Sequence, residues 1–288
     1  MRKISACYPA GCLCILISAL AAQLDAAPPD GKPESHSFQV AIVSELQNKI
    51  GDMTQKIEAT ADIRYAWKNV DRDRILTFNQ LGSKALMDGK LLIDNTMSRD
   101  KFIKVSEGMT TEIKSTEVPE RLRKMLQASF GEPLCKVQRD ADGKEVKRTI
   151  MSSPDAKVMI DNGMIVNALL FHPPYYAGKA EWQSDSEISM GNGGTAKGKL
   201  HYKKAEGNTF QVAGVLSNDE FKMEATGLTL KNAKYIVEGS QRYDPAMREW
   251  VAGKMDIKVG YEMALGTTNL GTASGIMKLK FERIKPQE

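Results

Sequence analysis

The sequence predicts an α+β fold, in which a large curved antiparallel sheet (a half-barrel or open barrel) has two or three helices packed on it. Three observations lead to this prediction. Residues 54–68 alternate between apolar and polar side chains. Residues 179–284 consist of extended runs separated by Gly, Asn or Asp turns, at spacings of roughly 10 to 14 residues. Residues 118–133 contain an amphipathic stretch bounded by proline and glycine, as helices commonly are.

The N-terminal residues 1–26 have the pattern of a secretory signal peptide. Two basic residues precede the apolar stretch Cys12–Ala22, which is shorter than the about 20 residues that a spanning helix needs. Cleavage after Ala21 or Ala26 fits the small residues there, and the second position is preferred. We therefore expect an exported protein, periplasmic or extracellular, that is not an integral membrane protein.

The remaining chain is expected to form one β-rich domain, residues 38–288, after a lead-in. Residues 27–37 are rich in proline and small polar residues, which predicts disorder. Residues 38–50 have apolar side chains at helix-like spacings and are predicted to be a short amphipathic helix. A further helix is predicted to begin at Ser153, with Pro154 in its first turn.

Two turns are visible between the predicted strands of the first half. Asp88-Gly89 supplies the positive φ of a tight hairpin, and a second hairpin is expected at residues 141–143. In the second half we predict seven strands, including one over residues 221–230.

Charge and cysteine usage exclude some classes of function. The 40 basic and 36 acidic residues become 38 and 35 without the signal peptide, and they are interleaved along the chain. Nucleic-acid binding therefore has no support in the composition. Three of the four cysteines lie in the signal peptide, so only Cys135 would remain and no internal disulfide is expected. The neighbours of Cys135 favour a half-buried strand residue over a nucleophile.

One stretch, Gly191–Tyr202, contains the G-x-x-x-x-G-K order of a phosphate-binding loop. Leu200 occupies the position where such a loop has Ser or Thr, and the residues around it alternate as in a strand. A strand has no helix N-terminus to stabilise phosphate. We therefore predict a glycine-rich hairpin and no nucleotide site.

No motif in the sequence predicts an enzyme, a metal site or a cofactor. The three histidines lack zinc-ligand spacing, and the acidic turns lack the calcium-binding pattern. Pairs of carboxylates, such as Glu181 with Asp185 and Asp244 with Glu249, leave an undetected hydrolase as an open alternative.

Aromatic and methionine side chains are suited to line an apolar cavity on the concave face of the sheet. The residues predicted for this lining are Tyr65, Trp67, Met164, Phe171, Tyr176 and Trp182. Ordinary core packing is the alternative explanation for the same side chains.

Three segments, "FHPPYYAGKAEW", "KLHYKKAEGNTFQVAGV" and "GSQRYDPAMREW", resemble a family of secreted bacterial β-rich domains of unknown function. The similarity in the first segment lies in Phe-x-Pro-Pro, Gly178 and Trp182, with a departure at residues 179–181. It covers about residues 54–284, implies export and brings no catalytic residue. The order of elements is also similar to that of periplasmic lipoprotein carriers, lipid-binding half-barrels whose helices cover a concave apolar face.

These features together predict an exported, non-enzymatic protein that binds a lipid or another amphipathic ligand on the concave face. Two alternatives stay open: a structural or interaction module of the cell envelope without a small-molecule ligand, and the undetected hydrolase.

Overall fold

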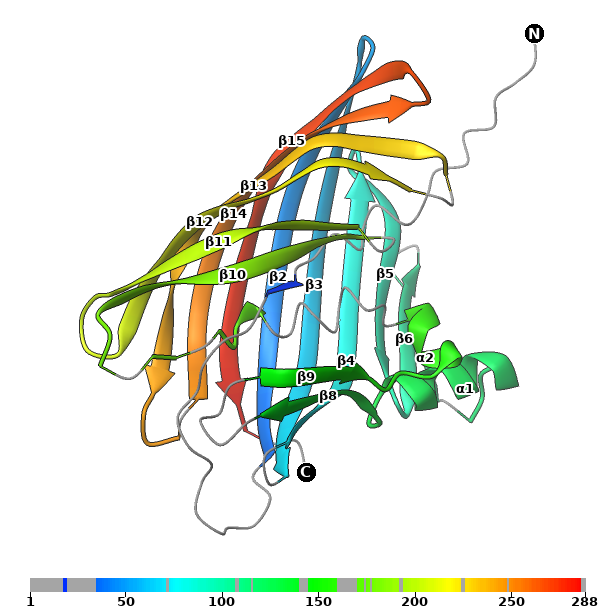
Figure 1. The fold of residues 1–288 in the computed structure, drawn as a ribbon. Helices are drawn as coiled ribbons and strands as arrows, with labels where there is room; N and C mark the ends of the chain where they lie inside the picture. Colours follow the sequence, from blue (N-terminus) through cyan, green and yellow to red (C-terminus); the bar gives the residue numbers. More distant parts are fainter. Residues whose placement is uncertain are drawn as a thin grey trace, which may run out of the picture.

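The computed structural model of the protein describes the ranges that follow (Figure 1). They are residues 18–19, 35–70, 73–106, 109–114, 116–139, 145–159, 170–173, 175–176, 178–191, 194–223, 226–247 and 249–285. The predicted signal peptide (apart from residues 18–19), most of the predicted lead-in and the turn at residues 141–143 lie outside the described residues.

The described residues form one large antiparallel sheet of 15 strands. Its order is β1-β10-β11-β12-β13-β14-β15-β2-β3-β4-β5-β6-β7, with β8 paired to β4 and β9 to β8. The strands are β1 (Ser18–Ala19), β2 (Ser35–Ile50), β3 (Met53–Val70), β4 (Asp73–Met87), β5 (Lys90–Ser98), β6 (Lys101–Ser106), β7 (Met109–Lys114), β8 (Pro133–Arg139), β9 (Glu145–Ile150), β10 (Glu181–Gly191), β11 (Gly194–Lys204), β12 (Thr209–Lys222), β13 (Leu228–Asp244), β14 (Glu249–Leu265) and β15 (Thr268–Ile284).

The α+β prediction is wrong, because the described residues are almost entirely β. They contain two short helices, α1 (Glu120–Ser129) and α2 (Pro154–Met159). The segment predicted to be a helix over residues 38–50 is instead most of β2, which pairs along its length with β3 and β15. The helical spacing left out Val40, which alternates in phase with Phe38 and Ile42 as a strand requires. Two neighbouring strands satisfy the backbone of β2, so tertiary pairing decides its structure.

Both helices begin where the sequence predicts. Helix α1 follows Pro119 directly. After its end, Gly131 has a φ of 80°, and its backbone N–H donates a hydrogen bond to the carbonyl of Phe78 on β4. The hydroxyl of Ser153 accepts a hydrogen bond from the backbone of Ala156 and so caps α2, whose predicted continuation lies outside the described residues. No helix formed by the described residues has the length and apolar character needed to cross a membrane.

The strands on the two sides of each predicted turn pair with one another, and the strand count differs in one place. Asp88 and Gly89 both have positive φ, at 50° and 77°, between β4 and β5. The stretch with the nucleotide-like motif is the β10–β11 hairpin, where Leu200 is fully buried and no helix follows. Residues 221–230, predicted to be one strand, instead contain the end of β12 and the start of β13.

The sheet is strongly twisted, so β10 and β11 run at a large angle to β2–β4 (Figure 1). Glycine is required where the backbones of β11 and β12 approach closely. A Cβ added at Gly198 would lie 2.1 Å from the carbonyl oxygen of Val215, and one at Gly214 would lie 2.3 Å from that of Lys199. These two glycines on paired strands therefore permit an approach that no other residue allows.

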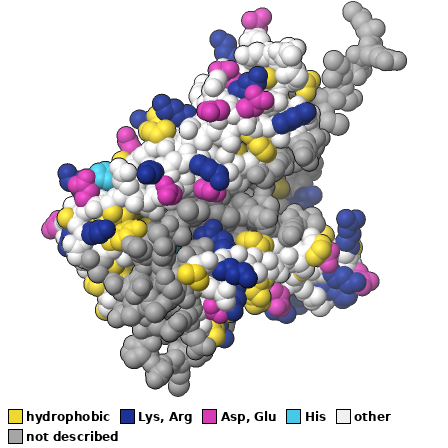
Figure 2. All heavy atoms as spheres, viewed as in Figure 1, with side chains coloured by type: hydrophobic (Ala, Val, Ile, Leu, Met, Phe, Trp, Pro, Cys, Tyr) yellow, Lys and Arg dark blue, Asp and Glu magenta, His cyan; other side chains and the backbone are white. Residues whose placement is uncertain are grey.

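The hydrophobic core lies on one side of the sheet, which we call the inner face. It is the face that carries Phe38 of β2, Tyr65 of β3 and Phe281 of β15, all at most 1% exposed. The outer face alternates with it and carries mixed charge, as the scattered Lys, Arg, Asp and Glu side chains in Figure 2 illustrate. Cys135 is buried in β8 opposite Leu76 of β4 and belongs to the same core.

Candidate functional site

The segment from Leu170 to Tyr176, described except for residue 174, packs on the inner face and contacts two aromatic clusters. The first surrounds His172 and contains Phe38, Tyr65, Trp67 and Phe281, and the second contains Trp182, Tyr202, Phe210, Tyr243 and Trp250. Phe171 stacks on Phe281 with ring centroids 5.0 Å apart, and Tyr175 stacks on Tyr243 at 3.7 Å. Between them the indole nitrogen of Trp250 donates a hydrogen bond of 2.7 Å to the carbonyl of Pro173. The segment is thus fastened at three points to strands β13, β14 and β15.

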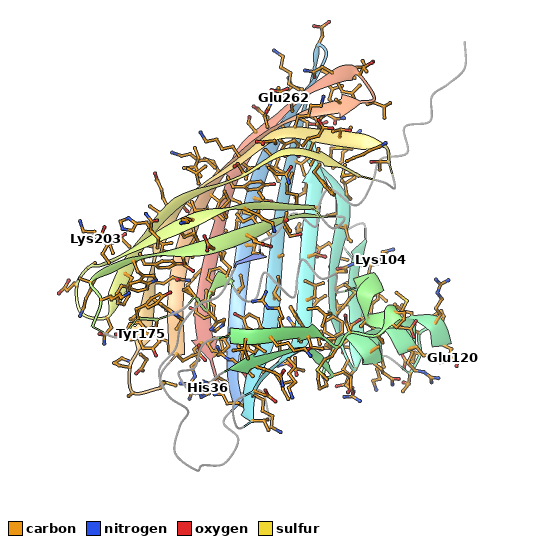
Figure 3. The ribbon with its side chains drawn as sticks, in the orientation of Figure 1. His36, Lys104, Glu120, Tyr175, Lys203 and Glu262 are labelled. Carbon is orange, nitrogen blue, oxygen red and sulfur yellow. The ribbon has the colours of Figure 1, made fainter. Side chains whose placement is uncertain are left out.

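A buried cluster of charged and polar side chains lies beside this segment. Arg74 of β4 forms an ion pair with Glu249 of β14, and both side chains are at most 7% exposed. The other carboxylate oxygen of Glu249 lies 2.8 Å from Nδ1 of His172, and Nδ1 of His36 lies 3.8 Å from the ion-paired oxygen. Figure 3 shows His36 and Tyr175 at the same lower end of the molecule.

The protonation of Glu249 is set by this surrounding charge. Burial alone would raise the pKa of its carboxyl group, but the charges of Arg74 and His172 outweigh burial and hold the pKa well below its ordinary value. The carboxylate is therefore ionised, and the paired guanidinium of Arg74 also stacks over the ring of Trp67 at 4.6 Å.

Tyr65 completes a chain of contacts with the order carboxylate, imidazole, hydroxyl. Its hydroxyl lies 3.0 Å from Nε2 of His172, whose other ring nitrogen contacts Glu249. Nucleophilic relays have this order, but Tyr65 is fully buried and burial raises the pKa of its hydroxyl well above the ordinary value. The phenol therefore stays protonated inside the core, and the contacts fasten the 170–176 segment rather than activate a nucleophile.

In each carboxylate pair noted in the sequence, the carboxylates that make contacts bind groups other than each other. Glu181 is exposed on β10 and contacts His201 at 2.6 Å. Asp244 caps the turn after β13 through the backbone of Ala246, while its register partner Glu249 points into the buried cluster. Among the described residues, no group of three or more His, Cys, Asp or Glu side chains is placed to hold a metal ion.

Most of the residues predicted to line a cavity are found on the inner face, but in packed clusters. Tyr65 and Trp67 lie with Phe171 around His172, and Tyr176 lies with Trp182 at the second cluster. Trp67 is 1% and Trp182 is 7% exposed, so neighbouring side chains surround them. Met164 lies outside the described residues.

The inner face continues beyond the buried core toward the β2–β3 turn at Gly51. Leu46 of β2 and Ile57 of β3 are register partners there, and together with Ile50 they form what we call the distal inner face. All three are partly buried, whereas Glu45 and the other alternating residues of this end of β2 lie on the outer face. These apolar side chains continue the core and are covered only in part by the described residues, and the polar side chain of Asn48 lies between Leu46 and Ile50 on the same face.

Comparison with known proteins leaves the family of this chain open. No family model matches the sequence, and no curated protein matches it. A structure of lipid–protein interactions in lipovitellin is similar at 10% identity and a TM-score of 0.47, over 90% of this chain and 26% of that chain. Acinetobacter baumannii OccAB4 is similar at 8% identity and a TM-score of 0.19, over 89% of this chain and all of that chain. This chain thus spans about a quarter of the lipovitellin chain, and likeness at these scores carries no inference about function.

Proposed function

We propose that this protein is an exported, non-enzymatic binding protein that holds a lipid or another amphipathic ligand against the inner face of its sheet. The observation that carries the proposal is the distal inner face. Leu46 and Ile50 pack against the apolar core there, and Ile57 is the register partner of Leu46; the described residues cover none of the three fully. Removing apolar surface from water contributes roughly 25 cal/mol per Å², so an acyl chain lying on these side chains would be stabilised.

The inner face of β2 carries large apolar side chains and its outer face carries mostly polar and charged ones, which supports ligand binding on the inner face alone. On β2, Leu46 and Ile50 point inward, while Glu45, Gln47 and Lys49 are exposed on the outer side. The aromatic clusters around His172 and Trp182 then form the base of the face, and the apolar part of the ligand contacts its distal half.

A binding experiment with one inward and one outward variant tests the proposal. Purified protein is measured by native mass spectrometry before and after organic extraction, and by uptake of a fluorescent fatty acid. We expect co-purifying lipid and saturable uptake, with Leu46→Gln weakening uptake several-fold. Val43→Gln is the matched control, because Val43 lies on the same strand and is 47% exposed on the outer face. Equal uptake by both variants would contradict binding on the inner face.

A structural module of the cell envelope is the second candidate, and the packing of the predicted lining residues favours it. Tyr65, Trp67 and Phe171 are at most 1% exposed, so they are packed inside the hydrophobic core. Absence of any co-purifying lipid together with absence of probe uptake would support this module and overturn the carrier. Export is tested separately by N-terminal sequencing of the mature protein from the cell envelope, where a chain that retains Met1 would contradict it.

A further inference from the structure

Three neighbouring residues on the inner face carry buried polar groups that have no hydrogen-bond partner among the described residues. They are the indole nitrogen of Trp182 on β10, the hydroxyl of Tyr202 on β11, and both amide atoms of Gln241 on β13. The residues are 7%, 0% and 1% exposed. Buried polar groups in folded proteins are nearly always hydrogen-bonded, because an unpaired one has lost its contact with water. Unpaired groups on three neighbouring residues are therefore hydrogen-bonding groups that a bound molecule could satisfy.

The three residues lie close together on neighbouring strands. Trp182 and Tyr202 are register partners, and their rings stack with centroids 5.2 Å apart. The ring of Phe210 lies 5.0 Å from that of Trp182, and Phe210 is in turn the register partner of Gln241. The side chain of Gln241 lies over Gly253 of β14, where a Cβ would come within 2.9 Å of its Cγ. The three residues thus belong to one patch, together with the ring of Phe210.

Among the described residues, no charged side chain acts on the hydroxyl of Tyr202 in this patch, and burial alone raises its pKa. The buried charges Arg74 and Glu249 already form an ion pair with each other. A buried carboxylate or phosphate needs a paired cation, so the patch suits a neutral group.

We propose that Trp182, Tyr202 and Gln241 form a polar subsite for the uncharged head group of an amphipathic ligand, such as a hydroxyl, ester or amide. The indole donates to a carbonyl oxygen, the Gln241 amide both donates and accepts, and the Tyr202 hydroxyl serves in either role. The inference rests on the proposed function, since the apolar part of the ligand would lie against the inner face.

Two probes with the same acyl chain separate the head group from the tail. Monoolein has a neutral glycerol ester, and oleate has a carboxylate. In the full-length mature protein we expect Tyr202→Phe and Gln241→Leu each to weaken monoolein binding about tenfold, and to change oleate binding by less than about twofold. Tyr235→Phe is the matched control. It also removes a buried hydroxyl without a partner among the described residues, but on β13 opposite Leu216 and away from the patch.

The possible outcomes distinguish the subsite from the carrier. Binding of both probes that neither Tyr202→Phe nor Gln241→Leu alters would overturn the subsite and leave the carrier standing. Internal water alone at the three groups would give this same result. Binding of neither probe to the wild-type protein would overturn the carrier and the subsite together.

A spectroscopic measurement keeps the test decisive if a variant loses its fold. The sequence contains three tryptophans, so an amide-detected NMR spectrum gives three indole N–H signals. We expect monoolein, but not oleate, to shift the signal of Trp182, identified by its loss in Trp182→Phe. The indole of Trp67, which lies beside His172 in the other aromatic cluster, is the internal reference. An unmoved Trp182 signal at saturating monoolein would contradict the subsite.

Discussion

Arg74 and Glu249 are 175 positions apart in the sequence and form an ion pair inside the core that joins β4 to β14. These strands belong to the two halves of the sheet, which meet where β2 pairs with β15. The pair also positions His172, and through it the 170–176 segment that lies on both aromatic clusters. One buried contact thus connects the first and last thirds of the chain with the segment between them.

Replacing Glu249 with glutamine should destabilise the protein by about 3–5 kcal/mol, because it leaves the buried guanidinium of Arg74 without a counter-charge. Urea unfolding followed by tryptophan fluorescence measures the change. The double variant Arg74→Met/Glu249→Leu should recover a large part of the loss, since it removes both charges. Glu282→Gln is the surface control, because Glu282 is 42% exposed in its ion pair with Lys280, and it should change stability by less than about 1 kcal/mol. A Glu249→Gln variant as stable as that control would contradict the role of the pair.

Stability should fall in acid in a way that Glu249 controls. Its ordinary pKa is 4.5, and in the folded protein Arg74 and His172 hold the pKa well below that value. The ionised group therefore contributes stability that is present above about pH 4.5 and is lost as the pH falls through the folded pKa. Unfolding free energies between pH 7 and pH 3 should decline more steeply in the wild-type protein than in Glu249→Gln. Parallel declines would show that other carboxyl groups account for the acid sensitivity.

Local patterns in the sequence predict the elements whose structure is set locally. The alternation from Ile57 to Trp67 predicts β3 correctly, because each apolar residue of a half-buried strand must face the core. Pro119 and Gly131 predict the ends of α1, because they act through their own backbone geometry. The same reasoning is wrong for residues 38–50, because their apolar spacing fits the period of a helix as well as that of a strand. Only the pairing with β3 and β15 selects the strand.

The candidate site is predicted only in part, for a related reason. Hydrophobicity alone places Trp67 and Trp182 on the inner face, because large apolar residues are buried wherever the strand phase permits. The Arg74–Glu249 pair depends on strands far apart in the chain, so the sequence around either residue does not reveal its partner. One signal was present, since Arg74 alternates in phase with Leu76 and Phe78, which is unusual for a charge on a strand. A charged residue in the apolar phase predicts a buried partner even when the partner is unknown.

The 170–176 segment should loosen when His172 is replaced. His172→Ala removes the contacts of its ring with both Glu249 and Tyr65, so hydrogen–deuterium exchange should accelerate at residues 170–176 by about tenfold or more. The matched control is His201→Ala, because His201 is 40% exposed on the outer face and contacts Glu181. Unchanged protection of the segment in His172→Ala would mean that the aromatic stacking of Phe171 and Tyr175 is sufficient to hold it.

The protein should become less stable when a methyl group is added at Gly214, where β12 lies close to β11. The new Cβ would lie 2.3 Å from the carbonyl oxygen of Lys199, a backbone atom that moves only if β11 and β12 separate. Gly214→Ala should therefore destabilise the protein by about 2 kcal/mol or more, as overpacking against a fixed neighbour does. Gly260→Ala on β14 is the control, because its Cβ would meet only the carbonyl of Ala273, at 3.9 Å. That change should leave the melting temperature unchanged or raise it slightly, since alanine restricts the unfolded chain more than glycine does. Equal melting temperatures for the two variants would show that the close approach of β11 and β12 at Gly214 does not require glycine.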